Sequence, residues 1–242
     1  MTKARSGSGP SLLLSIRTFM KRFHSLILLL IFSAIDARAG GVGLGTTRLI
    51  YTSDSKQSSL EVRNTDSQSQ FLIQSWIENE QGQPSRDFVI TPPLFVLKPA
   101  SENMLKVLFA GKPLTQDRET LYWITVKAIP QMQTTTSENT LQFASASRIK
   151  LFYRPQSIAE GAVQSHTKIK ANNHNGTITF SNPTPFYITT TNVRIDNKSV
   201  APVMIAPKSE ATIPGKFQAA QRISYQTIND FGALTPVMDV HF

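Results

Sequence analysis

Hydrophobic residues along most of the chain occur in short runs that alternate with polar positions, and turn-forming residues separate the runs. Alternation with a period of two is typical of half-buried strands, and no segment after residue 40 keeps helical spacing over three turns. The pattern predicts a first group of strands at residues 60–63, 71–78, 87–90, 94–98, 104–109, 121–129 and 141–153. About seven short strands within roughly 100 residues are typical of an immunoglobulin-like sandwich.

A second group of strands is expected after residue 155. It covers residues 167–170, 176–181, 186–195, 200–205, 211–214, 222–227 and 237–242. Asn175 and Gly176 lie between two alternating runs, which is a strong signal for a tight hairpin. Pro155 ends strand pairing, so we place the hinge at residues 154–157. The chain is therefore predicted to be all-β, with two tandem immunoglobulin-like β-sandwich domains, residues 40–155 and 156–242.

The N-terminal region has the pattern of a secretory signal peptide. Residues 20–39 combine a basic start, an apolar stretch at residues 26–34 and an ARA motif before Gly40. The apolar stretch is about half of the ~20 residues that a membrane span needs, so an anchor is the less favoured alternative. We expect residues 1–39, a signal peptide with an N-terminal extension, to be removed; the start codon is Met1 or Met20. No membrane insertion is expected after cleavage.

Removal of this leader changes the charge argument. The chain has 25 Lys and Arg against 16 Asp and Glu, for a net charge of +9. The leader holds six of the basic residues and one of the acidic ones, which leaves 19 and 15 and a net charge of +4. Because no basic cluster remains to form a stripe, nucleic-acid binding is not expected.

Composition and motifs favour neither a metal site nor an enzyme. The chain has no cysteine, which excludes disulfides, thiol catalysis and cysteine-type zinc sites. His166 and His174 have no common zinc spacing, and with His241 they are interpreted as surface histidines. The alternating glycines at 41, 43 and 45 lack the strand and helix of a phosphate loop and indicate a flexible leading strand. We predict no cofactor, no metal and no catalytic residue.

The segment at residues 141–155, LQFASASRIKLFYRP, is the most informative part of the sequence. Its 15 residues exceed the usual five or six of a strand, and an apolar start at an edge favours aggregation unless a partner pairs with it. We infer that this strand acts through its backbone. The alternative, an ordinary core strand, accounts for Leu141 and Phe143 but not for the polar Ser145 and Ser147 on the same parity.

Seven motifs carry a family resemblance through their order and spacing. They are TTR at 46–48, FLIQSWI at 71–77, ITPP at 90–93, QDRETLYW at 116–123, IKLFYRP at 149–155, NPTPFY at 182–187 and INDFG at 228–232. Over essentially the whole mature chain, the sequence resembles periplasmic pilus (fimbrial) assembly chaperones of the chaperone–usher pathway. A loop of about eleven residues at 130–140 resembles the short-loop type.

This resemblance implies an L- or boomerang-shaped arrangement of the two sandwiches and a function in the periplasm of a Gram-negative bacterium. Such a chaperone lends a strand to pilus subunits with an incomplete immunoglobulin-like fold and delivers them to an outer-membrane usher. It needs no cofactor. The matched donor positions are Leu141, Phe143 and Ser145. The family usually has a bulky apolar residue where Ser145 lies. Ser145 would therefore leave one pocket of the subunit underfilled, with a loss of about 1.5–3 kcal/mol of apolar burial, unless the groove of the subunit is shallower or the donor register differs. Self-association that caps the free donor strand is a further expected contact.

The resemblance also assigns charged residues. Arg48 and Lys150 match the anchor for the C-terminal carboxylate of the subunit, although solvated surface cations are the alternative. Lys150 has the opposite parity to Phe143, which leaves open a bend or bulge between them. Glu119, Arg154 and Asp230 match an interdomain charge network that would orient the two domains.

Two other classes of protein are weighed against a chaperone. A surface-exposed β-sandwich adhesin or structural pilus component would have an incomplete fold and its own N-terminal donor extension. A secreted carbohydrate-active enzyme would have paired carboxylates across a cleft. Neither feature is found in the sequence. At residues 91–93, the Thr-Pro-Pro segment predicts a constrained turn with a cis proline.

Overall fold

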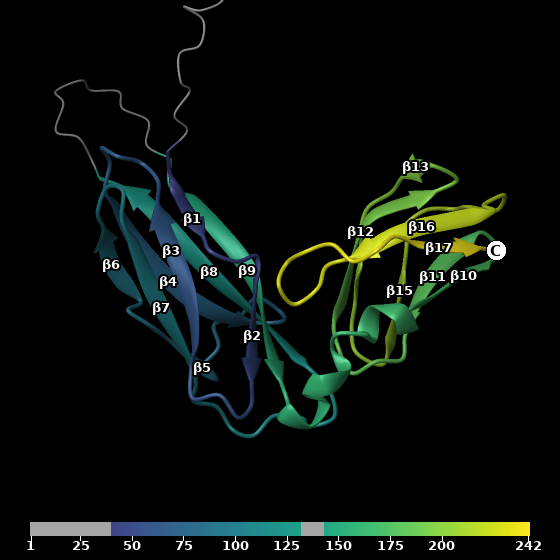
Figure 1. Ribbon diagram of the computed structural model, residues 1–242, viewed down its shortest axis with the longest axis horizontal. Coiled ribbons are helices and arrows are strands. Elements are labelled where there is room, and N and C mark those ends of the chain that lie inside the picture. The colour runs from purple at the N-terminus through teal and green to yellow at the C-terminus, as the bar shows by residue number, and fades with distance from the viewer. Residues whose placement is uncertain (1–39, 132–142) are drawn as a thin grey trace, which may run out of the picture. The chain divides into compact units, whose positions relative to one another are not determined.

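The structure is a computed structural model that describes residues 40–131 and 143–242 (Figure 1). These residues belong to one compact unit, Gly40–Phe242. The predicted signal peptide and extension, the donor residue Leu141 and most of the loop at 130–140 lie outside the described residues. The described part of the chain has no helix with the length and hydrophobicity needed to cross a membrane.

The first half of the unit is a sandwich of two sheets (Figure 1). Its strands are β1 (Val42–Leu44), β2 (Arg48–Thr52), β3 (Ser58–Asn64), β4 (Phe71–Asn79), β5 (Phe88–Thr91), β6 (Leu94–Leu97), β7 (Glu102–Phe109), β8 (Thr120–Pro130) and β9 (Ser145–Arg154). One sheet has the order β1-β3-β7-β5 and the other β2-β9-β8-β4-β6. This confirms the all-β prediction for this region.

Alternation builds the core of this sandwich. On β3, Leu60 and Val62 are fully buried, while the neighbouring Ser59 and Arg63 are exposed. Leu60 and Val62 pack in one cluster with Ile73 from the facing sheet and with the aromatic rings of Tyr51, Phe88, Tyr122 and Tyr153. Apolar side chains from both inner faces thus supply the stability that a chain without disulfides requires.

The chain changes sheets between β1 and β2. β1 pairs with β3 in one sheet, whereas β2 pairs in parallel with β9 in the other. The sequence indicated a leading strand at its glycines, and the structure divides this segment into two short strands. The expected constrained turn is confirmed, because the Thr91–Pro92 peptide bond is cis.

The second half contains another sandwich. Its strands are β10 (Lys170–His174), β11 (Thr177–Asn182), β12 (Ile188–Ile195), β13 (Lys198–Ser199), β14 (Met204–Ile205), β15 (Ser209–Thr212), β16 (Arg222–Thr227) and β17 (Met238–His241). One sheet has the order β10-β11-β15, and the other has β13-β12-β16-β17 with β14 also paired to β12. The core includes Ile178, Phe180, Ile205, Ile223 and Tyr225.

The predicted hairpin at Asn175 and Gly176 joins β10 to β11. Both residues have positive φ, 50° and 75°, and His174 pairs with Thr177 across the turn. These torsions are typical of a type I′ turn, whose twist matches that of the flanking strands. The sequence signal for this hairpin is therefore confirmed.

The predicted strand at 167–170 is wrong. After Pro155 the chain forms two 3₁₀ helices, η1 (Gln156–Gly161) and η2 (Ser165–Lys168), and β10 begins only at Lys170. The hydroxyls of Ser165 and Thr167 donate to carbonyls three residues earlier, at 2.8 Å each. Such local bonds favour turns over a sheet ladder. Of the strand expected at 200–205, only β14 at its end forms, and the two-residue β13 lies just before that range.

Candidate functional site

One edge of β9 is only half covered. β9 pairs antiparallel with β8 from Ser145, opposite Ala128, to Tyr153, opposite Thr120. On the other side it pairs with β2 only from Lys150 onward. Among the described strands, none pairs with this second edge over residues 145–149. Backbone groups along that edge are therefore available to an added strand.

The pairing of β9 with β8 fixes which way its side chains face. It runs without a register shift from Ser145 to Tyr153. Ser145 and Ser147 therefore continue the row of the buried Ile149, whereas Lys150 lies on the opposite face. The bend or bulge that the sequence left open is absent from the described residues between Ser145 and Lys150. The strand keeps two distinct faces.

The expected donor positions that the structure describes are accessible. Phe143 precedes β9 and is 77% exposed, and Ser145, the first residue of the strand, is also exposed. Leu141 lies outside the described residues. An exposed phenylalanine next to a free strand edge is available to a partner groove.

Arg48 and Lys150 are brought together where β2 begins. They are direct neighbours in the parallel register of β2 and β9. Arg48 is buried, and its Nη1 donates to the carbonyl of Ile228 at 3.0 Å. Its guanidinium lies over the ring of Phe152 at 5.9 Å from the centroid. Its Nε is buried and has no hydrogen-bond partner, which is costly for a charged group.

Lys150 supplies a second positive charge, and among the described residues only one hydrogen bond and no ion pair offset the cost of burying it. Its Nζ donates to Thr189 Oγ1 at 2.7 Å, and no carboxylate of the described residues lies within ion-pair distance. Burial, together with the charge of Arg48, lowers the pKa of Lys150 to about 8. A buried and a half-buried cation lie side by side here with unused N–H groups, which is an arrangement chemically suited to an anion.

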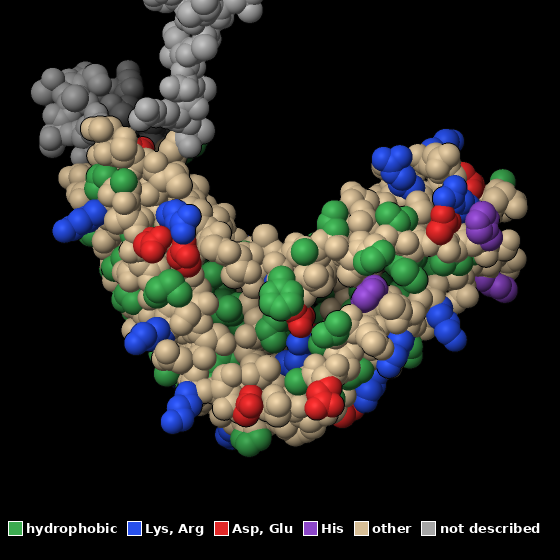
Figure 2. Space-filling view, viewed as in Figure 1, with side chains coloured by type: hydrophobic (Ala, Val, Ile, Leu, Met, Phe, Trp, Pro, Cys, Tyr) green, Lys and Arg blue, Asp and Glu red, His purple; other side chains and the backbone are tan. Residues whose placement is uncertain are grey.

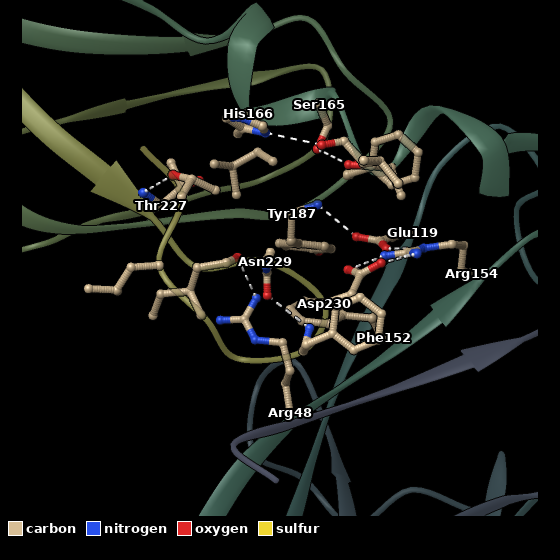
Figure 3. A pocket seen from close by; sticks show the side chains of 18 of the residues that line it. Arg48, Glu119, Phe152, Arg154, Ser165, His166, Tyr187, Thr227, Asn229 and Asp230 are labelled. Carbon is tan, nitrogen blue, oxygen red and sulfur yellow. Dashed lines mark hydrogen bonds and ion pairs between the residues drawn. The ribbon is translucent and has the colours of Figure 1, made fainter. Parts of the chain in front are cut away.

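Arg154 at the end of β9 lies between two carboxylates (Figure 3). Its Nε donates to Glu119 Oε1 at 2.7 Å, and its Nη1 and Nη2 donate to Asp230 at 2.6 and 2.8 Å. The side chains of Arg154 and Glu119 are 7% and 1% exposed, whereas that of Asp230 is 37% exposed. The structure thus brings together all three residues that the sequence grouped.

Tyr187, for which no role was predicted, completes this cluster. Its backbone N–H donates to Glu119 Oε2 at 2.8 Å, and its hydroxyl donates to Glu80 Oε1 at 3.1 Å. Burial raises the pKa of the Glu119 carboxyl, and the charge of Arg154 and the Tyr187 amide oppose that effect. The NPTPFY motif contains Tyr187, but its contacts depend on tertiary placement that the motif does not reveal.

A pocket of about 260 Å³ opens beside these charges (Figure 3). Its lining is partly charged and partly apolar. The arginine and carboxylate side chains that line it are Arg48, Glu119, Arg154 and Asp230. The apolar side chains come from β9, from the segment between η1 and η2, from the start of β12 and from the loop between β16 and β17: Phe152, Ala162, Val163, Phe186, Ile188, Ile228, Phe231, Leu234 and Pro236. Lys150 does not line the pocket but lies next to Arg48 across the strand pair.

Two immunoglobulin-like sandwiches with one half-covered strand edge define a class of β-sandwich proteins suited to binding an extended segment by strand addition. The chain belongs to the pili assembly chaperone family. Residues 41–159 match the family described as "Pili and flagellar-assembly chaperone, PapD N-terminal domain". Residues 162–237 match "Pili assembly chaperone PapD, C-terminal domain". The protein is thus a chaperone of pilus assembly.

Known relatives cover nearly the same length. The chaperone protein FocC of Escherichia coli is 45% identical over 220 residues, which cover 89% of this chain and 96% of FocC. The crystal structure of the periplasmic chaperone SfaE superposes with a TM-score of 0.73 at 43% identity and covers 82% of this chain and 98% of that chain. A chain in the complex of the Salmonella enterica SafA pilin with the SafB chaperone gives a TM-score of 0.74 at 25% identity, covering 84% and 96%.

Proposed function

We propose that this protein acts in the periplasm of a Gram-negative bacterium, where it folds and caps pilus subunits by donor-strand complementation and delivers them to an outer-membrane usher. The observation that carries this proposal is the unpaired edge of β9 at residues 145–149, which leads directly to Arg48 and Lys150. The Salmonella relative SafB, whose complex contains the SafA pilin, supports the choice of partner.

The geometry also favours one direction for the added strand. A strand on the free edge of β9 lies in line with β2 and must stop where β2 begins, at Arg48. If it runs parallel to β9, as β2 does, its C-terminal carboxylate meets Arg48 and Lys150. If it runs antiparallel, a positive N-terminus would meet two cations. Charge therefore favours the parallel direction.

We assign roles to the site residues on this basis. Leu141, Phe143 and Ser145 face the groove of the subunit, and Arg48 and Lys150 hold its terminal carboxylate. Glu119, Arg154 and Asp230 join the end of β9 to the segments before β8 and after β16, which keeps the carboxylate site assembled.

We also propose the processing and the division of the chain. Residues 1–39 are removed as a signal peptide with its extension, and residues 40–155 and 156–242 form the two domains. The ARA motif before Gly40 supports the cleavage position. The end of β9 at Arg154 and the start of η1 after Pro155 support the boundary. Without a subunit, self-association through the free edge of β9 caps it.

The test is co-expression with the pilin-like subunits encoded alongside this protein, followed by recovery of complexes from the periplasm. Lys150→Ala removes one cation of the anchor and should lower subunit recovery at least tenfold, because each charge-assisted bond contributes about 1.5–3 kcal/mol. Lys106→Ala, at an exposed lysine on β7 in the other sheet, is the matched control and should leave recovery unchanged. Full recovery with folded Lys150→Ala would refute the anchor.

A further inference from the structure

Three large hydrophobic side chains around the pocket face solvent. Phe231 is 90% exposed, Val163 is 80% exposed and Leu234 is 53% exposed, and all three line the same opening. Single exposed hydrophobic residues are ordinary, but several around one pocket form a contiguous apolar surface that marks a binding site. Figure 2 shows hydrophobic side chains beside acidic and basic ones on the face drawn.

The loop between β16 and β17 holds Phe231 in this exposed position. Asn229 Oδ1 accepts hydrogen bonds from the backbone N–H groups of Phe231 and Ala233, at 3.0 Å each. The neighbouring Asp230 is fixed by its two bonds to Arg154. The loop is thus ordered before any partner binds, so that a contact made by Phe231 costs little additional conformational entropy.

Close packing places this loop beside the proposed anchor. Gly232 has φ +80°, and a Cβ at this position would lie 2.6 Å from Thr47 Oγ1, next to Arg48 in the chain. Only glycine fits there. Arg48 lines the pocket together with Phe231, and its unpaired Nε marks the polar end. The floor consists of the buried Phe152, Phe186 and Ile188.

The size and chemistry of the pocket indicate its occupant. A volume of about 260 Å³ is below the roughly 300–1,000 Å³ of sites for whole small-molecule ligands, so it suits one or two side chains. A chain end that combines a carboxylate with an apolar side chain matches a cationic end and an apolar floor.

We propose that this pocket is a selectivity subsite for the last side chain of the bound subunit, with preference for a large apolar residue. Phe231, Leu234 and Val163 would close over that side chain, while Arg48 and Lys150 hold the adjoining carboxylate. The inference rests on the proposed function, because the parallel strand is what brings a chain end to this pocket. It adds side-chain selectivity from the second sandwich to a site whose two cations come from the first.

The test uses short synthetic peptides of alternating valine and threonine that differ only at the C-terminal end. One ends in phenylalanine with a free carboxylate, one in serine with a free carboxylate, and one in phenylalanine carboxamide; binding is measured by fluorescence anisotropy. The wild type should bind the phenylalanine acid about tenfold more tightly than the serine acid. Phe231→Ser should remove this difference without changing the affinity for the serine acid.

The controls separate this inference from the proposed function. Val89→Ser, at a 50%-exposed valine on β5, should keep the difference between the two acids, whereas Lys150→Ala should weaken both. Leu234→Ser serves as a second variant if Phe231→Ser does not fold. A preference that survives in Phe231→Ser, or an equal loss for both acids, overturns the subsite while the proposed function stands.

The carboxamide peptide and the oligomeric state test the anchor and the identity of the occupant. If the carboxamide binds as tightly as the acid and Lys150→Ala has no effect, the anchor fails and the subsite fails with it. Sedimentation velocity measures whether the protein dimerises, which tests the alternative that a second copy of this chain occupies the pocket. A dimer that dissociates in Phe231→Ser, with peptide binding unchanged, overturns the subsite in favour of self-association.

Discussion

At the scale of single residues, Lys150 has the property that most directly reports on subunit binding. Burial and the charge of Arg48 hold its pKa at about 8 in the unbound protein. A carboxylate placed against Nζ stabilises the charged form and raises that pKa. Binding is therefore coupled to proton uptake when the pH is near or above 8, and the protonated form is the one that binds.

The expected result is a pH-dependent affinity. Binding of a subunit, or of its C-terminal peptide, should be strongest below pH 8 and should weaken as the pH rises above it. Titration calorimetry between pH 6.5 and 9.5, within about 1.5 units of that value, measures this dependence. Lys150→Arg keeps a charge that does not titrate in this range, so its profile should be flatter. A flat profile for the wild type would exclude Lys150 as the anchor.

The same pKa affects the unbound protein with a definite sign. The folded-state pKa of Lys150 lies below the ordinary 10.5, so between about pH 8 and 10.5 the unfolded chain binds more protons at this residue. The contribution of Lys150 to the free energy of unfolding therefore rises with pH across that window. Burial thus costs stability at neutral pH, which is expected of a cation kept for binding rather than for folding.

At the scale of elements, β9 combines two functions in one strand. Residues 150–153 are paired on both edges, and Leu151 and Tyr153 among them belong to the core, while residues 145–149 have one free edge. On the row that includes the buried Ile149, the small side chains of Ser145 and Ser147 leave space. This row faces the groove of an added subunit in the proposed complex.

Ser145→Leu tests that orientation. A leucine at this position should fill an apolar pocket of the subunit and stabilise the complex by about 1.5–3 kcal/mol, mostly through slower dissociation. The dissociation rate is measured by displacement with labelled protein. Ala146→Leu, on the opposite face of β9, is the matched control and should have no such effect. A faster dissociation for Ser145→Leu would show that the groove is closed here or that the register differs.

At the scale of the whole molecule, strands were predictable where one face of the strand is buried and the other is exposed to solvent. β16 begins and ends as predicted because its buried residues alternate strictly. The segment before β10 was missed because the hydroxyls of Ser165 and Thr167 form local bonds that favour turns. At the site, motifs identified Arg48, Lys150 and Arg154. Thr189 was not predictable, because a single hydroxyl carries no pattern and gains its role only from tertiary contact.

The three ion-paired residues connect distant parts of the molecule, and Arg154→Met tests what they do. Loss of Arg154 leaves Glu119 buried without its cation, which should lower the free energy of unfolding by about 3 kcal/mol. Urea denaturation measures this change. Asp230→Asn should cost much less, because Asp230 is 37% exposed and water screens its charge.

Capture of subunits by the same variants separates orientation from stability. If the network keeps the carboxylate site assembled, Arg154→Met should bind subunits more weakly even at temperatures where it is fully folded. Adding Glu119→Gln removes the unpaired buried charge and should restore part of the stability, because a neutral pair avoids most of the desolvation cost. It should not restore capture, since the link from β9 to Asp230 stays broken. Restored capture in the double variant would mean that the network contributes only stability.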